Sequence, residues 1–415
     1  MNKEQPVILA YDAVSPLGVD LESAWQRAIQ GGSGIGPLTR FPLRLGFPVQ
    51  IAGQVEEIDE AAFSFLNLRD MAHWTSPVFR HALLVVHRAL EKSRIEISGD
   101  IAPRVAITFS SAIGGLDAVL SADRLLMAEN KLPHPFTNPN SCINMVGGKI
   151  SIMTGATGPI TATITACATG ATSMIIGALF LQQGMADVVI CGAVDFPLVE
   201  PIVAGFATMN GAYRPKKGSE ESPAQASRPF SVHRRGFVVS EGAACVILAT
   251  KSFARTHGLP WALEMAGWSM TADAYHFVAP NPETVHRCIQ ESILHADIQP
   301  EDIESVNAHG TSTKVGDKVE AEALRRVFGN AIPPLAANKS QIGHAMGASS
   351  AIETVLALEG MMRGEILPTL NYVPDPEIPL DVVSDKAFAV QQEFLLKNAF
   401  GFGGCNACIV FHRNS

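Results

Sequence analysis

Short apolar runs alternate with longer amphipathic segments along most of the chain. Strands alternating with helices in this way predict a layered α/β architecture with a largely buried sheet. Runs rich in β-branched and small apolar residues predict buried strands at residues 7–11, 105–110, 187–191, 243–249, 303–308 and 407–411. Apolar positions three and four residues apart predict helices at residues 77–93, 169–183, 282–296, 318–327 and 348–363.

Two stretches share the order strand, small-residue turn, helix. One is Ile-Thr-Ala-Cys-Ala-Thr-Gly at residues 164–170, and the other is Val-Asn-Ala-His-Gly-Thr-Ser-Thr at residues 306–313. This likeness indicates an internal duplication with a seam near residues 251–259. We therefore expect an N-terminal half at residues 1–255 and a C-terminal half at residues 256–415.

Composition narrows the class of protein. The chain has 415 residues, of which 47% are hydrophobic and 17% charged, so it can bury a large core and is not disordered. Its net charge of −9 argues against nucleic acid or an anionic membrane as a general partner. We expect no membrane span, because no apolar run reaches about 18 residues, and no secretory signal. Seven scattered cysteines do not form a disulfide pattern, so a cytoplasmic protein is expected.

Cys167 is the candidate nucleophile. It lies in Thr-Ala-Cys-Ala-Thr-Gly, directly after a β-branched run and just before a helical pattern. A thiol at such a turn faces free backbone N–H groups and the positive end of the helix dipole, and both lower a thiol pKa. The alternative is that Cys167 is a buried small apolar residue, as free cysteines often are.

Two histidines occupy similar positions. His309 follows a predicted strand and precedes Gly-Thr-Ser-Thr, and His344 lies between Gly343 and an Ala/Gly-rich helix. Strand ends are where open α/β sheets bind ligands. His276, in Asp-Ala-Tyr-His, is a candidate for a pocket wall, and the other histidines receive no role.

The segment Gly-Phe-Gly-Gly-Cys-Asn at residues 401–406 has backbone freedom to approach a ligand and direct N–H groups toward it. It fits an oxyanion-hole loop with an aromatic gate, and it equally fits an ordinary glycine turn. Cys405 and Cys408 form Cys-x-x-Cys without a second pair or a suitable histidine, so no metal site is expected.

Taken together, these segments resemble the β-ketoacyl-acyl carrier protein synthases of the thiolase superfamily, in the elongating Cys-His-His group. The resemblance covers nearly the whole chain, in ordered short matches. These are residues 13–18, 33–37, 111–116, 165–170, 227–230, 236–238, 241–242, 273–276, 307–313, 316–317, 343–344, 368–369 and 401–406, with Arg234 and Lys339.

The resemblance implies a five-layered αβαβα thiolase-like fold built from two similar halves, usually as a homodimer. It also implies decarboxylative condensation of an acyl group on Cys167 with malonyl-acyl carrier protein, giving a 3-oxoacyl thioester in fatty acid or polyketide-like biosynthesis. No cofactor is expected on the enzyme itself, because phosphopantetheine of the acyl carrier protein carries the substrates.

The resemblance also implies roles for individual residues. His309 and His344 would bind the malonyl thioester carbonyl and stabilise the enolate. Lys339 would orient the site through a charge network with Asp317, Glu320 or Glu353. Backbone N–H groups of Cys167 and Phe402 would form the oxyanion hole, with Phe402 also gating the acyl tunnel. The substrate-binding residues would be Thr311, Thr313, Phe402, Gly403 and His276.

The chain departs from the family pattern in places. Thr172 stands where histidine is common, and Trp-Thr-Ser-Pro at residues 74–77 replaces a basic cluster that engages the acidic carrier protein. One interpretation is a carrier protein from a specialised pathway. The other is divergence, with Arg69, Arg80, Lys216 and Lys217 supplying the docking charge.

Two other functions share part of this pattern. The first is a non-catalytic synthase-like subunit of the chain-length factor type, in a heterodimer with an active partner; such proteins characteristically lack the cysteine that is present here. The second is a thiolase-type or initiating synthase, which the paired histidines disfavour.

Overall fold

The computed structural model describes residues 5–215 and 221–414, so Lys216 and Lys217 lie outside the described residues. Within these ranges, ten strands are hydrogen-bonded one to the next in a single row. The two halves of this row have the same pattern of strand pairing. The order is β5-β4-β6-β7-β1 in the first half and β10-β9-β13-β14-β8 in the second. In each half the first two pairings are parallel and the last two antiparallel.

The two sheets meet at one corner, where Val7 and Ile8 of β1 pair with β8. The N-terminal sheet consists of β1 (Val7–Val14), β4 (Val105–Ser110), β5 (Ile160–Thr161), β6 (Val188–Asp195) and β7 (Gly242–Ala249). The C-terminal sheet consists of β8 (Leu263–Ala272), β9 (Ser305–Asn307), β10 (Leu335–Ala336), β13 (Phe394–Gly401) and β14 (Cys405–Arg413).

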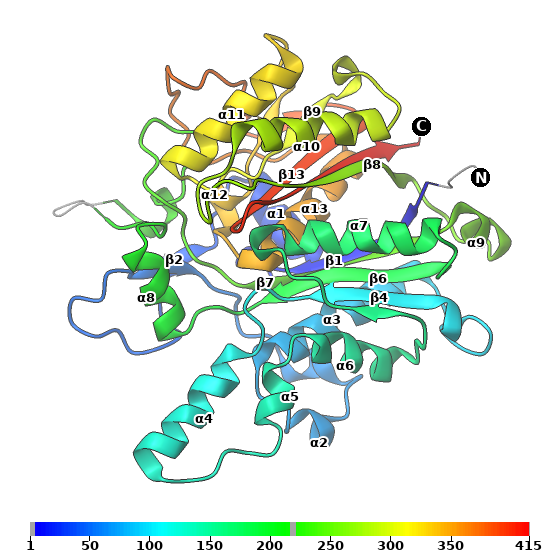
Figure 1. Ribbon diagram of the computed structural model, residues 1–415, viewed down its shortest axis with the longest axis vertical. Coiled ribbons are helices and arrows are strands. Elements are labelled where there is room, and N and C mark those ends of the chain that lie inside the picture. Colours follow the sequence, from blue (N-terminus) through cyan, green and yellow to red (C-terminus); the bar gives the residue numbers. More distant parts are fainter. Residues whose placement is uncertain (1–4, 216–220, 415) are drawn as a thin grey trace.

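Helices above, between and below the sheets complete five layers, which Figure 1 shows from top to bottom. The outer helices are α10 (Pro282–His295) and α11 (Lys314–Phe328) on the C-terminal sheet, and α3 (Pro77–Ser93) and α6 (Asn144–Thr154) on the N-terminal sheet. The middle layer consists of α7 (Thr169–Gln182) and α13 (Met346–Arg363). The expected αβαβα thiolase-like fold is therefore confirmed.

The remaining elements lie around these layers. The other helices are α1 (Leu21–Ile29), α2 (Leu68–Met71), α4 (Leu116–Glu129), α5 (Thr137–Ser141), α8 (Glu200–Thr208), α9 (Lys251–Thr256) and α12 (Lys339–Ile342). The short strands β2 (Ile35–Pro37) and β3 (Ile51–Gly53) pair with each other, as do β11 (Glu365–Ile366) and β12 (Phe388–Ala389). No helix among the described residues is long and apolar enough to cross a membrane.

The outer and middle helices differ in the distribution of apolar residues because they are buried to different extents. The outer helix α3 is amphipathic, and it begins at Pro77 in the first turn and ends before Arg94 in the left-handed conformation. The middle helices α7 and α13 have apolar residues on all sides, because a sheet lies against each of their faces. Small residues bring α7 and α13 together: a Cβ at Gly170 would lie 2.6 Å from the backbone nitrogen of Ala351.

The contact at Gly170 predicts that Gly170→Ala destabilises the protein by about 1–3 kcal/mol, because the added methyl group overpacks the α7–α13 crossing. The matched control is Gly205→Ala, in the exposed part of α8 with no atom near its Cβ position. That change replaces glycine with a better helix former and should add up to about 1 kcal/mol. Urea unfolding of both variants measures the difference, and equal effects would contradict the close contact.

Candidate active site

Four turns from both halves meet around one cavity of about 500 Å³. Its lining includes Cys167 from the N-terminal half and His309, His344 and Phe402 from the C-terminal half. Thr311, Thr313 and His276 also line it. The structure thus brings together around one cavity the residues that were predicted to contact substrate, with the exception of Gly403.

Cys167 lies in a single 3₁₀ turn, Ala166–Ala168, that leads directly into α7. The turn is tight: Ala166 has φ +48°, a left-handed conformation that costs roughly 1–2 kcal/mol for a non-glycine residue. The end of β13 crosses close behind it, since a Cβ at Gly401 would lie 2.3 Å from the carbonyl oxygen of Thr165. Thr172, where the family commonly has histidine, accepts a hydrogen bond from the hydroxyl of Thr165 (2.8 Å).

His344 is in direct contact with the nucleophile candidate. Its Nε2 lies 3.0 Å from the Sγ of Cys167, and its Nδ1 lies 2.8 Å from the Oγ of Ser349. The His309 ring stands nearly perpendicular to the His344 ring, with the ring centroids 5.9 Å apart. Both imidazoles therefore face the cavity beside the sulfur.

Burial sets the protonation of all three groups. It raises the pKa of Cys167 to about 11, although the charge of Lys339 and the N–H of Phe402 act in the opposite direction. The expectation of a lowered thiol pKa is therefore wrong, because the loss of hydration outweighs the nearby positive charge. Burial and the charge of Lys339 hold the pKa of His309 and of His344 well below the usual range, so both imidazoles are neutral.

A buried carboxylate holds two lysines behind the histidines. Glu353 of α13 accepts a hydrogen bond from Lys397 Nζ (2.7 Å) and forms an ion pair with Lys339 Nζ (2.6 Å). Lys339 also donates to the carbonyl oxygen of His309 (2.6 Å) and to His309 Nδ1 (3.4 Å). Of the three acids proposed to partner Lys339, Glu353 forms the ion pair.

The other two acids hold backbone. Glu320 accepts from the N–H groups of His309 and Gly310, both at 2.8 Å. Asp317 accepts from the N–H groups of Phe230 (2.7 Å) and Thr311 (3.0 Å). Together they determine the path of the turn that follows β9.

Two charged residues of this region, Lys397 and Asp195, were not predicted from the sequence. Lys397 lies in β13, where an interior lysine looks like a solvent-facing strand position. Asp195 ends β6 and accepts from Ser111 Oγ (2.5 Å), Ile113 N (2.9 Å) and Gly347 N (2.7 Å), which ties β6 to the start of α13. An acid at the end of an otherwise apolar run was the available signal for Asp195.

Phe402 and Gly403 differ in position. Phe402 lines the cavity, and its backbone N–H points at the Cys167 sulfur. Gly403 is exposed, has φ +82° and donates its N–H to the carbonyl oxygen of Phe277 (2.9 Å), so it lies outside the cavity lining. Its role in substrate binding stays a prediction.

The threonines and His276 lie along the cavity wall. The hydroxyls of Thr311 and Thr313 are 2.9 Å apart, and Thr313 caps α11 by accepting from Gly316 N. His276 is exposed, and its Nδ1 accepts from Val278 N and Ala279 N, both at 3.0 Å.

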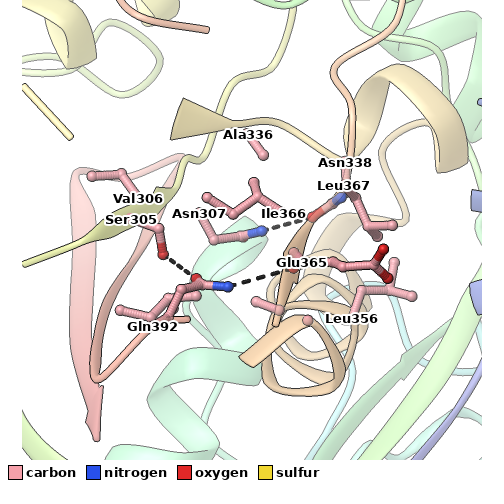
Figure 2. A pocket seen from close by; sticks show the side chains of 13 residues that line it. Ser305, Val306, Asn307, Ala336, Asn338, Leu356, Glu365, Ile366, Leu367 and Gln392 are labelled. Carbon is pink, nitrogen blue, oxygen red and sulfur yellow. Dashed lines mark hydrogen bonds between the residues drawn. The ribbon is translucent and has the colours of Figure 1, made fainter. Parts of the chain in front are cut away.

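A small second pocket is lined by residues of β9, β10, β11, β13 and α13 (Figure 2). Asn307, at the end of β9, donates to Asn338 (2.6 Å). Asn338 immediately precedes Lys339, and Asn307 stands two residues before His309. This side-chain bond therefore links the two turns that hold the cation and the imidazole.

Asp317 gives the site a pH-dependent contribution to stability. Burial raises its pKa to about 7, so the folded protein favours the protonated carboxyl. Its stabilising contribution is complete below about pH 4, the range of an exposed aspartate, and is lost as the pH rises through about 7. The free energy of unfolding of wild type minus that of Asp317→Asn should fall between pH 4 and pH 8, as denaturant titrations would show. A difference that rises or stays flat contradicts the raised pKa.

Comparison with known proteins places the chain in a family. The family description "Beta-ketoacyl synthase, N-terminal domain" matches residues 3–254, and "Beta-ketoacyl synthase, C-terminal domain" matches residues 263–373. A Coxiella burnetii protein named 3-oxoacyl-[acyl-carrier-protein] synthase 2 is 35% identical over 100% of this chain and 99% of its own length.

Two solved structures share the fold along all of both chains. One is a ketosynthase solved with the acyl-carrier protein of its type II polyketide synthase, with a TM-score of 0.91 and 24% identity. The other is the ishigamide ketosynthase/chain length factor, with a TM-score of 0.90 and 26% identity. With two family domains matched and a full-length relative at this identity, the chain belongs to the β-ketoacyl synthase family and is an acyl-transferring condensing enzyme.

Proposed function

We propose that the enzyme takes an acyl group onto Cys167 and condenses it with a malonyl thioester, releasing carbon dioxide and a 3-oxoacyl thioester. The supporting observation is the 3.0 Å contact between Cys167 Sγ and His344 Nε2, beside His309 in one cavity. A thiol with two neutral imidazoles meets the needs of both half-reactions, acyl transfer and enolate formation.

In the first half-reaction, Cys167 Sγ attacks the carbonyl carbon of the acyl thioester. The backbone N–H groups of Cys167 and Phe402 are our proposed donors to the resulting oxyanion. The carbon–sulfur bond to the carrier breaks, and the proton that leaves Cys167 ends on the departing thiol. Burial of the site limits hydrolysis of the acyl-enzyme by water.

In the second half-reaction, the malonyl thioester loses its carboxylate as carbon dioxide, and the electron pair of that bond forms an enolate. The Nε2–H groups of His309 and His344 are the proposed donors to the enolate oxygen. The enolate carbon then attacks the acyl carbonyl on Cys167, and the carbon–sulfur bond of the acyl-enzyme breaks. The released Cys167 thiolate takes a proton from water, which restores the neutral thiol. Lys339 acts through its contact with His309 as a positioning residue.

An acyl carrier protein is the proposed partner, with its phosphopantetheine arm in the cavity along Thr311, Thr313 and His276. The solved ketosynthase complex with an acyl-carrier protein supports this choice. Trp74 is buried against Phe79 and Phe136, and Arg80 is paired with Glu60. The region that carries a basic cluster in relatives has a buried Trp74 and an ion-paired Arg80 here, while Arg69 is exposed. The smaller positive charge supports a specialised carrier over the housekeeping one. We place the enzyme in the cytoplasm, because its seven cysteines are free.

The test of this function is mass spectrometry after incubation with an acyl-carrier thioester. We expect a covalent acyl adduct on Cys167 and its absence in Cys167→Ala. Cys142→Ala is the matched control, since Cys142 is exposed and should leave the adduct unchanged. If no acyl donor modifies wild type, the non-catalytic subunit is the remaining interpretation.

A homodimer is the proposed assembly, formed through the outer edge of β5. That edge ends the strand order, and three isoleucines near it are exposed: Ile152 by 75%, Ile160 by 44% and Ile164 by 50%. An exposed strand edge flanked by apolar side chains favours pairing with a second chain.

Light scattering tests the assembly. Wild type should have twice the chain mass of 44.2 kDa, and Ile160→Lys should be monomeric, because a charge on the edge opposes pairing. Leu294→Lys is the control at a site on α10 that is 65% exposed, and it should remain dimeric. A monomeric wild type rules out the homodimer and leaves a heterodimer with a synthase-like subunit.

A further inference from the structure

Ser349 lies on the opposite side of His344 from the thiol. It is the fourth residue of α13, is fully buried, and its Oγ is 2.8 Å from His344 Nδ1. Within the described part of the chain, no second hydrogen bond of this hydroxyl is observed. Cys167, His344 and Ser349 therefore form a continuous chain of hydrogen-bonding groups.

The two imidazoles have partners of different kinds. Lys339 has only protons to donate, so its contact with His309 Nδ1 keeps the hydrogen of His309 on Nε2. A serine hydroxyl can either accept from Nδ1–H or donate to Nδ1. His309 is thus held as a donor toward the cavity, whereas the hydrogen of His344 can lie on either nitrogen.

The two half-reactions need opposite states of His344. Attack by Cys167 needs a free electron pair on Nε2 to take the thiol proton, because the buried thiol is neutral at pH 7. Stabilising the enolate needs a hydrogen on Nε2. A partner that only donates or only accepts would favour one half-reaction at the expense of the other.

We propose that Ser349 is a positioning residue that allows His344 to act first as a base toward Cys167 and then as a hydrogen-bond donor toward the enolate. This inference rests on the proposed function. During acyl transfer the thiol proton moves to Nε2 and then to the departing carrier thiol, so His344 returns to its neutral Nδ1–H form. Between the half-reactions the first carrier leaves, and Nε2 takes a proton from water in the cavity. The Nδ1 proton is then given up to the hydroxide so formed, and the hydroxyl rotates to donate to Nδ1.

The decisive variant is Ser349→Ala, which favours helix formation and adds no volume. It removes the acceptor for Nδ1–H, and a buried N–H without a partner is strongly disfavoured. His344 should then keep its hydrogen on Nε2. Rapid-quench measurements at pH 7 should show acylation of Cys167 slowed roughly 10- to 100-fold, with carbon dioxide release from the malonyl thioester reduced no more than about threefold.

The pH profile distinguishes this role from a structural one. In wild type the acylation rate should change little between pH 7 and pH 9, because His344 takes the proton. In Ser349→Ala it should rise about tenfold per pH unit as the thiol ionises without a base. Ser350→Ala is the matched control: its hydroxyl accepts from Ala171 N (3.1 Å) instead of a histidine, and its acylation should keep the wild-type profile.

Each result has a distinct meaning. A flat acylation profile in Ser349→Ala, or equal losses in both half-reactions, overturns the role of Ser349 while leaving the proposed function standing. Absence of any acyl adduct in wild type overturns the proposed function itself. A steep profile in Ser350→Ala as well would show a packing effect and would also overturn the inference.

Discussion

The ion-paired carboxylate of Glu353 determines how the site is held together. It lies between Lys339 of α12 and Lys397 of β13, and all three side chains are almost completely buried. Removing one partner from such a pair is strongly destabilising, because a charge is then left without hydration or compensation. The arrangement therefore fixes three elements together, and through Lys339 it also fixes the backbone at His309. Asp317, Glu320 and Asp195 accept hydrogen bonds from backbone N–H groups and so extend the same constraint to the neighbouring turns.

Burial favours one part of the chemistry at the expense of another. A water-poor cavity protects an acyl-enzyme and strengthens each hydrogen bond to a developing oxyanion. The same burial keeps Cys167 in its neutral form, so the site needs a base in contact with the sulfur. In the proposed mechanism this base is His344, whose Nε2 lies 3.0 Å from the sulfur. The position of the thiol at a helix start is thus only part of its activation.

Much of the fold followed from local pattern. The predicted helix at residues 77–93 coincides with α3, since an amphipathic outer helix with Pro77 in its first turn is visible in sequence. Strand β13 was missed, because Lys397 and Asn398 interrupt its apolar run and their partners come from distant elements. The partners of Cys167 were identified from turn motifs and family resemblance together. Ser349 was not, because its role depends on a rotation of α13 that no local pattern predicts.

The middle layer has a consequence for synthesis on the ribosome. Helix α13 follows most of the chain in sequence, yet it packs against α7 and against β6 and β7 of the first sheet. Helix α7 covers part of the inner face of the first sheet, and the part that α13 covers stays open until α13 has been made and has left the ribosome. During that interval the exposed apolar surface of the nascent chain favours aggregation, and chaperones can bind it. This risk follows from the middle layer of helices that the two halves share.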